Sequence, residues 1–120
     1  MKVNGDIIHM KEIKIVIFGA GKSAQIVEDN LCDHVKVIAY LDNNKKKHGL
    51  IYKDSCIYSP LEIEHMEWDY IIIGSIYYEQ IEEQLKRIQV PLDKVISFFS
   101  NKAQEKSLTD NIFISEWKVH

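Results

Sequence analysis

Apolar and polar residues alternate along the chain in blocks whose lengths match strands and helices. Short apolar runs predict five strands, at residues 14–18, 35–41, 56–58, 70–73 and 95–99. The run at 70–73 is apolar without alternation, which is typical of a central parallel strand buried on both faces. Because the strands alternate with segments of helical length, the chain predicts an α/β fold with a doubly wound parallel sheet in the order 3-2-1-4-5.

Three helices are predicted between these strands. Two of them carry apolar residues at helical spacing. In the first, at 21–32, these are Ala20, Ala24, Val27 and Leu31; in the second, which Pro91 ends, they are Tyr77, Ile81, Leu85 and Ile88. A shorter helix is expected after the third strand, because Ser59 supplies a cap, Pro60 suits the first turn and Glu62 follows three residues after the cap.

The repeating pattern covers residues 14–100, which we expect to form one domain. A chain of 120 residues is long enough for a single core but not for two. Residues 1–13 are a mixed leader, and residues 101–120 form a tail that is polar at first and then apolar up to Trp117. The tail could pack across the sheet edge, exchange with a partner chain or lead into a further domain, and the sequence leaves these alternatives open.

The first strand runs directly into a small-residue turn that opens a helix. The turn and the first helical residues are Gly19, Ala20, Gly21, Lys22, Ser23 and Ala24. This is G-x-G-x-x-A, a variant of the dinucleotide fingerprint of Rossmann-like domains. In that fingerprint the first glycine permits a tight turn, the second permits close approach of a phosphate, and the third small residue lets helix meet strand. We therefore expect residues 19–23 to hold phosphate through backbone N–H groups at the helix start.

An acidic residue stands where a ribose ligand is expected. Asp42 ends the second strand, a little over twenty residues after Gly19, and Asn43 follows it; both are expected to hold the ribose. A carboxylate there can accept hydrogen bonds from both ribose hydroxyls. The alternative is that Asp42 only heads a turn, as Asp and Asn residues often do. Gly74, Ser75 and Ile76, after the fourth strand, are expected to form a wall beside the base.

The acid also bears on the choice of cofactor. The Asp42 carboxylate would repel a ribose 2′-phosphate, so NAD is favoured over NADP, although Lys45, Lys46 and Lys47 could reach an anionic group. A P-loop is not supported, because Val16 stands where its first glycine belongs. A SAM-binding fragment remains a weaker alternative, since such proteins also pair a glycine turn with an acid.

No catalytic constellation is visible in the chain, and the catalytic residues are unknown. A Tyr-x-x-x-Lys pair is missing at Tyr77 and Tyr78, which are followed four residues later by Ile81 and Glu82. We interpret both tyrosines as packing or pocket-wall residues.

The composition of the chain narrows its possible binding partners and its cellular compartment. The net charge of −3 argues against general nucleic-acid binding. Cys32 and Cys56 form no CxxC pair, and the five histidines have no ligand spacing, so no metal site is expected. The chain has no apolar run long enough to cross a bilayer and no signal peptide, which favours a cytoplasmic protein.

Several motifs occur together in an order that resembles a known family. They are the glycine turn, Ala39-Tyr40-Leu41-Asp42-Asn43-Asn44, the lysines up to Gly49, Ser59-Pro60 and Asp69-Tyr70-Ile71-Ile72-Ile73-Gly74-Ser75. Over residues 14–99 the chain is similar to the Rossmann-like domain of bacterial nucleotide-sugar epimerases and dehydratases of polysaccharide biosynthesis. That family includes the N-terminal domain of capsular-polysaccharide and sugar-acyltransferase proteins. The resemblance implies binding of a nucleotide or nucleotide-sugar at the glycine turn and Asp42.

The chain departs from catalytic members of that family in length, since it is too short to hold their further catalytic domain. Two hypotheses follow. The chain is an NAD- or nucleotide-sugar-binding domain that works with a separate catalytic domain, or it is a non-catalytic regulatory or assembly module, in which case we expect a homo-oligomer.

Overall fold

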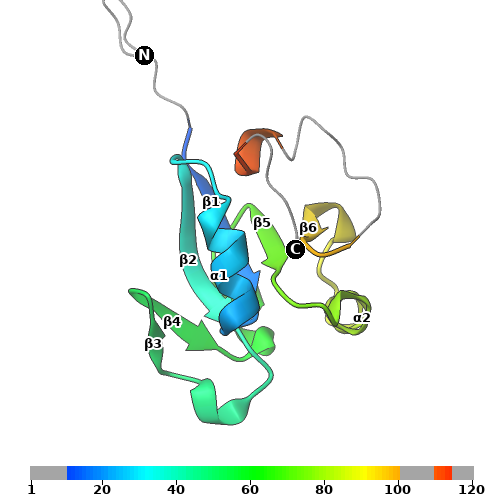
Figure 1. Cartoon of the computed structure of the whole chain (residues 1–120). Helices are drawn as coiled ribbons and strands as arrows, with labels where there is room; N and C mark the ends of the chain where they lie inside the picture. Colours follow the sequence, from blue (N-terminus) through cyan, green and yellow to red (C-terminus); the bar gives the residue numbers. More distant parts are fainter. Residues whose placement is uncertain (1–10, 101–109, 115–120) are drawn as a thin grey trace, which may run out of the picture.

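Six strands form one sheet in the order β3-β4-β2-β1-β5-β6 (Figure 1). They are β1 (Ile13–Phe18), β2 (Val35–Leu41), β3 (Ile51–Tyr52), β4 (Ser55–Tyr58), β5 (Tyr70–Ile73) and β6 (Val95–Ser97). All neighbouring strands are parallel except β3, which pairs with β4 in antiparallel fashion. This computed structural model describes residues 11–100 and 110–114. The parts of the predicted leader and tail at 1–10, 101–109 and 115–120, including Trp117, lie outside the described residues.

The five expected strands are present in the expected relative order, but the prediction of a five-stranded parallel sheet was wrong. The additional strand, β3, extends the sheet beyond β4 and is joined to it by a tight hairpin. The hairpin turn is Lys53-Asp54, and both residues have positive φ, 49° and 71°. Such turns normally contain glycine or asparagine, because their backbone is strained for other residues. The sequence therefore lacked the usual hairpin signal, and a two-residue strand shows no periodicity.

Two α-helices and three short 3₁₀ helices connect the strands. The α-helices are α1 (Lys22–Asp29) and α2 (Tyr78–Arg87), and the 3₁₀ helices are η1 (Lys45–Lys47), η2 (Pro60–His65) and η3 (Leu92–Lys94). The short helix expected after β4 is η2, and the Ser59 hydroxyl accepts a hydrogen bond from Leu61 N at 3.3 Å. This capping is what the sequence predicted, although the turns are tighter than α-helical.

The two predicted α-helices are shorter than their apolar patterns indicated. The first ends at Asp29 rather than at residue 32, and the Asn30 side chain donates a hydrogen bond to Ile26 O at 2.8 Å. Leu31 therefore lies beyond the helix, where it forms an isolated bridge with Phe113. Tyr77 precedes α2 and is 64% exposed, so it does not belong to the buried stripe.

Strand residues alternate between two buried layers, one on each face of the sheet. On one face, Ile15 and Ile17 of β1 pack in a cluster with Ala24 and Val27 of α1. On the other face, the intervening β1 residues pack in a cluster with α2 and η2. This period-two alternation is what buries a strand on both sides. Because β1, β2 and β5 are parallel, their carboxyl ends lie at one edge of the sheet.

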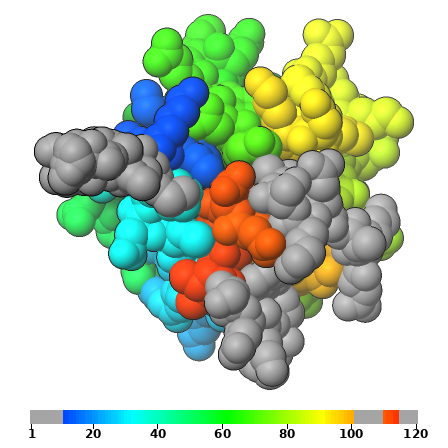
Figure 2. Space-filling model, turned by 90° about the horizontal axis from the view of Figure 1, so that it is seen from above, coloured from blue at the N-terminus to red at the C-terminus, as the bar shows by residue number. Residues whose placement is uncertain are grey.

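The described part of the tail completes the layer that contains α1. Ile112 and Phe113 are buried, and Phe113 lies edge-to-face on Phe98 with ring centroids 5.3 Å apart. The backbone of this segment pairs with the chain that follows α1: Cys32 N donates to Ile112 O at 2.9 Å. Figure 2 shows residues 110–114 (orange-red) lying against that part of the chain (cyan). Residues 110–114, of which 110–112 are helical, thus bury part of the layer that contains α1.

We expect Phe113→Ala to lower the free energy of unfolding by about 3–5 kcal/mol, because it removes a fully buried aromatic ring. The matched control is Ile114→Ala, whose side chain is 44% exposed and whose loss should cost less than about 1 kcal/mol. Urea denaturation of both variants measures the difference. Equal stability of the two variants would show that this segment does not pack on the sheet in solution.

Candidate functional site

An open cavity of about 320 Å³ lies where the carboxyl ends of β1, β2 and β5 meet. It is lined by Gly19, Ala20, Gly21, Lys22, Ser23, Asp42, Lys47, Gly74, Ser75, Ile76 and Tyr77. Every residue expected at a nucleotide site lines this cavity, with the exception of Asn43. In open α/β sheets, ligands bind at this edge, beyond the point where the strand order reverses.

Different structural constraints act on the three glycines that line the cavity. Gly19 has φ +118°, and a Cβ built on it would lie 3.0 Å from the carbonyl oxygen of Gly74. A Cβ on Gly74 would crowd the side chains of Ile17 and Val27 at 3.3 Å. Gly21 is different: its φ is −157°, and a Cβ there would meet no described atom within 4 Å. Protein packing therefore requires glycine at 19 and favours it at 74, but does not require it at 21.

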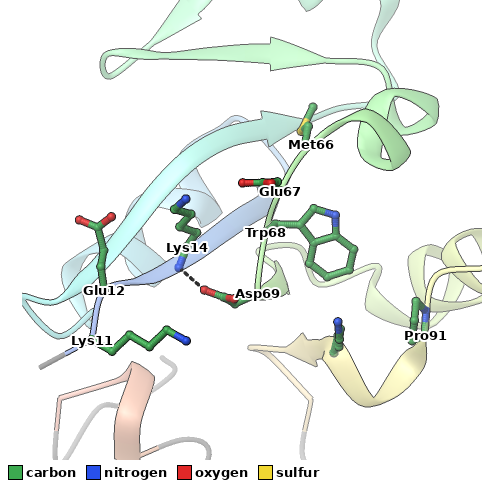
Figure 3. Close-up of a pocket in the computed structure, with 9 residues that line it drawn as sticks. Lys11, Glu12, Lys14, Met66, Glu67, Trp68, Asp69 and Pro91 are labelled. Carbon is green, nitrogen blue, oxygen red and sulfur yellow. Dashed lines mark hydrogen bonds between the residues drawn. The ribbon is translucent and has the colours of Figure 1, made fainter.

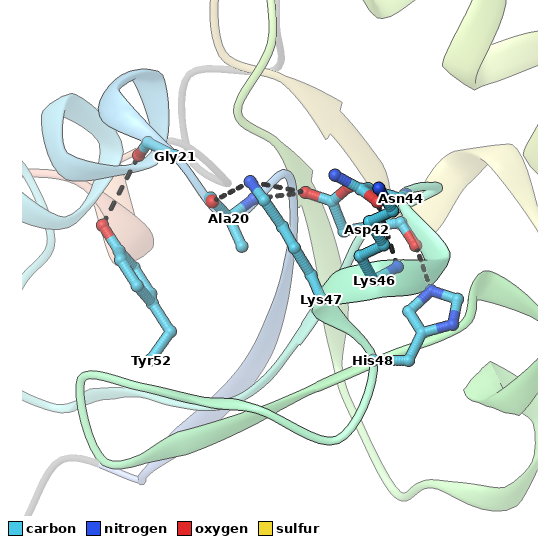
Figure 4. A network of polar contacts seen from close by, with 8 residues as sticks. All are labelled: Ala20, Gly21, Asp42, Asn44, Lys46, Lys47, His48 and Tyr52. Carbon is cyan, nitrogen blue, oxygen red and sulfur yellow. Dashed lines mark hydrogen bonds and ion pairs between the residues drawn. The ribbon is translucent and has the colours of Figure 1, made fainter.

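Asp42 braces the glycine turn from the end of β2. Its Oδ2 accepts a hydrogen bond from Ala20 N at 3.1 Å, and its Oδ1 accepts one from Asn44 N at 2.8 Å (Figure 4). The second contact is the turn role that the sequence left open as an alternative. The side chain remains 18% exposed toward the cavity. Its ribose role stays a prediction.

Lys47 closes the same network from the other side. Its Nζ donates to Ala20 O at 2.8 Å and lies 3.7 Å from Asp42 Oδ2. The lysine is positioned by η1, which begins with a hydrogen bond from Lys46 N to Asn44 Oδ1 at 3.0 Å. In the sequence the three lysines of η1 are equivalent, and only the turn of this short helix places Lys47, rather than Lys46, on the cavity.

Asn43 does not line the cavity, contrary to the sequence-based expectation. Its side-chain amide exchanges two hydrogen bonds with that of Gln84 on α2, at 3.0 and 2.8 Å. Both residues line a neighbouring cavity of about 290 Å³. The pair links the loop after β2 to the helix that follows β5. No local pattern could have indicated it, because the partners are 41 residues apart.

The wall after β5 combines a turn with exposed apolar side chains. Tyr77 N donates to Ser75 Oγ at 3.0 Å, which shapes the chain between β5 and α2. Ile76 and Tyr77 are 65% and 64% exposed, although both are large and apolar or aromatic. They stand beside the glycine turn, so the cavity has a backbone floor at residues 19–23 and an apolar rim. Tyr77 is thus a pocket-wall residue, one of the roles its sequence context suggested.

A larger cavity of about 480 Å³ lies at the opposite, amino-terminal edge of the strands (Figure 3). There Lys14 and Asp69 are joined by two hydrogen bonds, from Lys14 N to Asp69 Oδ2 at 2.8 Å and from Asp69 N to Lys14 O at 2.7 Å. Trp68 also lines it, with Lys94 Nζ 5.7 Å from its ring centroid. None of the residues expected to bind a nucleotide is here, and size alone does not make this cavity the candidate site.

The ionisable groups with clearly perturbed chemistry lie elsewhere. Burial, together with Glu28, raises the pKa of Tyr40, and burial raises the pKa of the Cys32 thiol. Neither residue lines the cavity. Within residues 11–100 and 110–114, no group of His, Cys, Asp or Glu is arranged to hold a metal ion. None of the helices described is long and apolar enough to cross a bilayer.

Comparison with known families decides which family the domain belongs to. Residues 11–96 match the family described as C2185-like, N-terminal. The chain belongs to this family. No curated protein matches the sequence.

Solved structures show that the fold of this C2185-like domain is Rossmann-like. UDP-D-quinovosamine 4-dehydrogenase from Vibrio fischeri is 22% identical with a TM-score of 0.52, covering 66% of this chain and 74% of that one. RSP, a Rex-family repressor crystallised with β-NAD⁺ and operator DNA, is 19% identical with a TM-score of 0.51 over 72% of this chain. The match covers 49% of RSP, so this chain spans about half of that protein. RSP with β-NADH is 20% identical, with a TM-score of 0.50, over 72% of this chain and 52% of that one.

Because different constraints act on Gly19 and Gly21, substitutions at the two positions should lower the free energy of unfolding by different amounts. Gly19→Ala should lower the free energy of unfolding by about 1–3 kcal/mol or more, because its φ is positive and its Cβ would crowd Gly74 O. Gly21→Ala should change it by less than about 1 kcal/mol, because the backbone is extended and the space is open. Thermal and urea unfolding test both. A Gly21→Ala variant as unstable as Gly19→Ala would contradict the open geometry.

Proposed function

We propose that this C2185-like domain binds a nucleotide, NAD or a nucleotide-sugar, in the cavity at residues 19–23. In this proposal it is the nucleotide-binding part of a nucleoside-diphosphate-sugar epimerase- or dehydratase-type protein of surface polysaccharide biosynthesis. The observation that carries the proposal is Gly21. It is a glycine at the second position of the fingerprint, it faces open space, and the fold itself does not require it.

The start of α1 offers hydrogen-bond donors to a phosphate. The first N–H groups of a helix have no intrahelical acceptor. Ala20 N and Ala24 N are already bonded, to Asp42 Oδ2 and Gly21 O. The N–H groups of residues 21–23 remain for a ligand, and the helix dipole favours negative charge there. Lys22 adds a positive side chain on the same rim of the cavity.

The rest of a nucleotide would extend from this phosphate position along the cavity. Asp42 would accept hydrogen bonds from the ribose hydroxyls, and Gly74 and Ser75 would form a wall beside the base. Ile76 and Tyr77 offer an exposed apolar rim on which a flat ring can pack. Asn43 is assigned no direct ligand contact, since it is bonded to Gln84.

Two lines of likeness support a nucleotide over other ligands. One structural neighbour is a UDP-sugar dehydrogenase, and the other was crystallised with β-NAD⁺ and with β-NADH. The ordered motifs of the sequence resemble nucleotide-sugar epimerases and dehydratases. No residue of the cavity is assigned a catalytic role. In this proposal the reacting groups come from a separate catalytic domain or partner, or from another copy of the chain.

We expect NAD, NADH or a UDP-sugar to raise the melting temperature of the wild-type protein. A ligand at a hundred times its dissociation constant stabilises by about 2.7 kcal/mol, which for a domain of this size is on the order of ten degrees. Gly21→Ala should reduce the shift and Gly21→Val should abolish it, because a side chain would occupy the space that the phosphate needs. Thermal-shift titration checks this, with isothermal calorimetry for the dissociation constant.

Gly21 is a cleaner test than Asp42, because Asp42 also braces the glycine turn and its loss would disturb the fold. The matched control is Leu61→Ala, whose side chain is 65% exposed and lies outside the cavity; it should bind like the wild type. Unchanged affinity in both Gly21 variants would exclude this cavity. Absence of any ligand-induced shift in the wild type would favour the regulatory or assembly module instead.

A further inference from the structure

We propose that Lys47 sets the ligand selectivity of this cavity by neutralising Asp42, so that a phosphate on the ribose is accepted and NADP binds about as well as NAD. This inference rests on the proposed nucleotide binding and revises the preference for NAD that Asp42 alone indicated. Of the three lysines in η1, only Lys47 has this role.

The side chains that line the cavity have a net positive charge. The residues that line the cavity carry one carboxylate, that of Asp42, and two ammonium groups, those of Lys22 and Lys47. The whole chain has a net charge of −3, so the cavity has the opposite sign to the protein around it. Repulsion of a second phosphate by Asp42 was the reason to favour NAD, and the ammonium 3.7 Å from Asp42 Oδ2 offsets that repulsion.

The Lys47 ammonium lies close to both Ala20 and Asp42. It holds Ala20 O at 2.8 Å and lies near Asp42 Oδ2, between the glycine turn and the end of β2. This is the side of the cavity at which the ribose of a bound dinucleotide meets the acid of β2. An ammonium has three N–H donors. The side chain is 38% exposed, so the group can contact Asp42 and Ala20 and still face a ligand.

The backbone around Lys47 is held in place by hydrogen bonds. The loop that carries it is fixed at several points: Asn44 caps η1, and His48 Nε2 lies 2.6 Å from Asp42 O. Gly49 N also donates to Ile57 O at 2.8 Å, which ties the end of the loop to β4. A lysine held by its backbone in this way loses less conformational freedom when it binds an anion than one on a free loop.

The experiment compares the dissociation constants of NAD and NADP, which differ by one phosphate. Titrations of the full chain are made at fixed ionic strength, with wild type, Lys47→Gln, Lys47→Arg and Lys46→Ala. Lys46 is the matched control, because it lies in the same turn but does not line the cavity. We expect wild type, Lys47→Arg and Lys46→Ala to bind the two cofactors within about threefold. Lys47→Gln should weaken NADP relative to NAD by about tenfold, or about 1.4 kcal/mol.

Each alternative outcome separates this inference from the proposed function. A tenfold preference for NAD in the wild type, or an unchanged ratio in Lys47→Gln, overturns the inference while nucleotide binding stands. An equal effect of Lys46→Ala shows general electrostatics and overturns the assignment to Lys47. Binding of UDP-sugars with neither dinucleotide also overturns it. If none of these ligands binds to the wild type, the proposed function itself is refuted.

Discussion

The close backbone contact between the turn after β1 and the end of β5 is the constraint on which the site depends. Gly19 and Gly74 approach each other so closely that a Cβ on the first would lie 3.0 Å from the oxygen of the second. Gly19 N donates to Leu41 O at 2.7 Å, and Gly74 N donates to Phe18 O at 3.0 Å. The turn is therefore held between the ends of three neighbouring strands. These backbone contacts place the start of α1 at the edge of the cavity.

Side chains then complete what the backbone contact begins. Asp42 and Lys47 hold the N–H and the carbonyl of Ala20, one from the end of β2 and one from η1. The glycine turn is thus braced by an acid and a base that also line the cavity. The same groups stabilise the turn and, in the proposed function, would meet a ligand. This dual role explains why loss of Asp42 is a poor probe of binding, whereas Gly21 bears only on access to the turn.

The two faces of the sheet are covered by different means. On one face, residues of α2 and η2 pack against the sheet. On the other, α1 is joined by Phe113 and its neighbours, which come from the far end of the sequence. The sheet edge at β3 carries exposed Leu50 and Ile51, at 54% and 69%. The hairpin that holds them also reaches the glycine turn, because Tyr52 OH lies 3.4 Å from Gly21 O.

Five of the six strands, their relative order and the glycine turn with its acid could be predicted from the sequence. The strands follow from the periodicity of apolar residues. The turn and the acid follow from their short spacing within one β-α-β unit. Three features could be found only in the folded structure: the pairing of Asn43 with Gln84, the position of Lys47 rather than Lys46 at the cavity, and the packing of Phe113 on the sheet. These contacts join residues far apart in the chain or depend on the φ angles of loops. No local pattern of residue types encodes such contacts, because they exist only once the strands have placed the loops together.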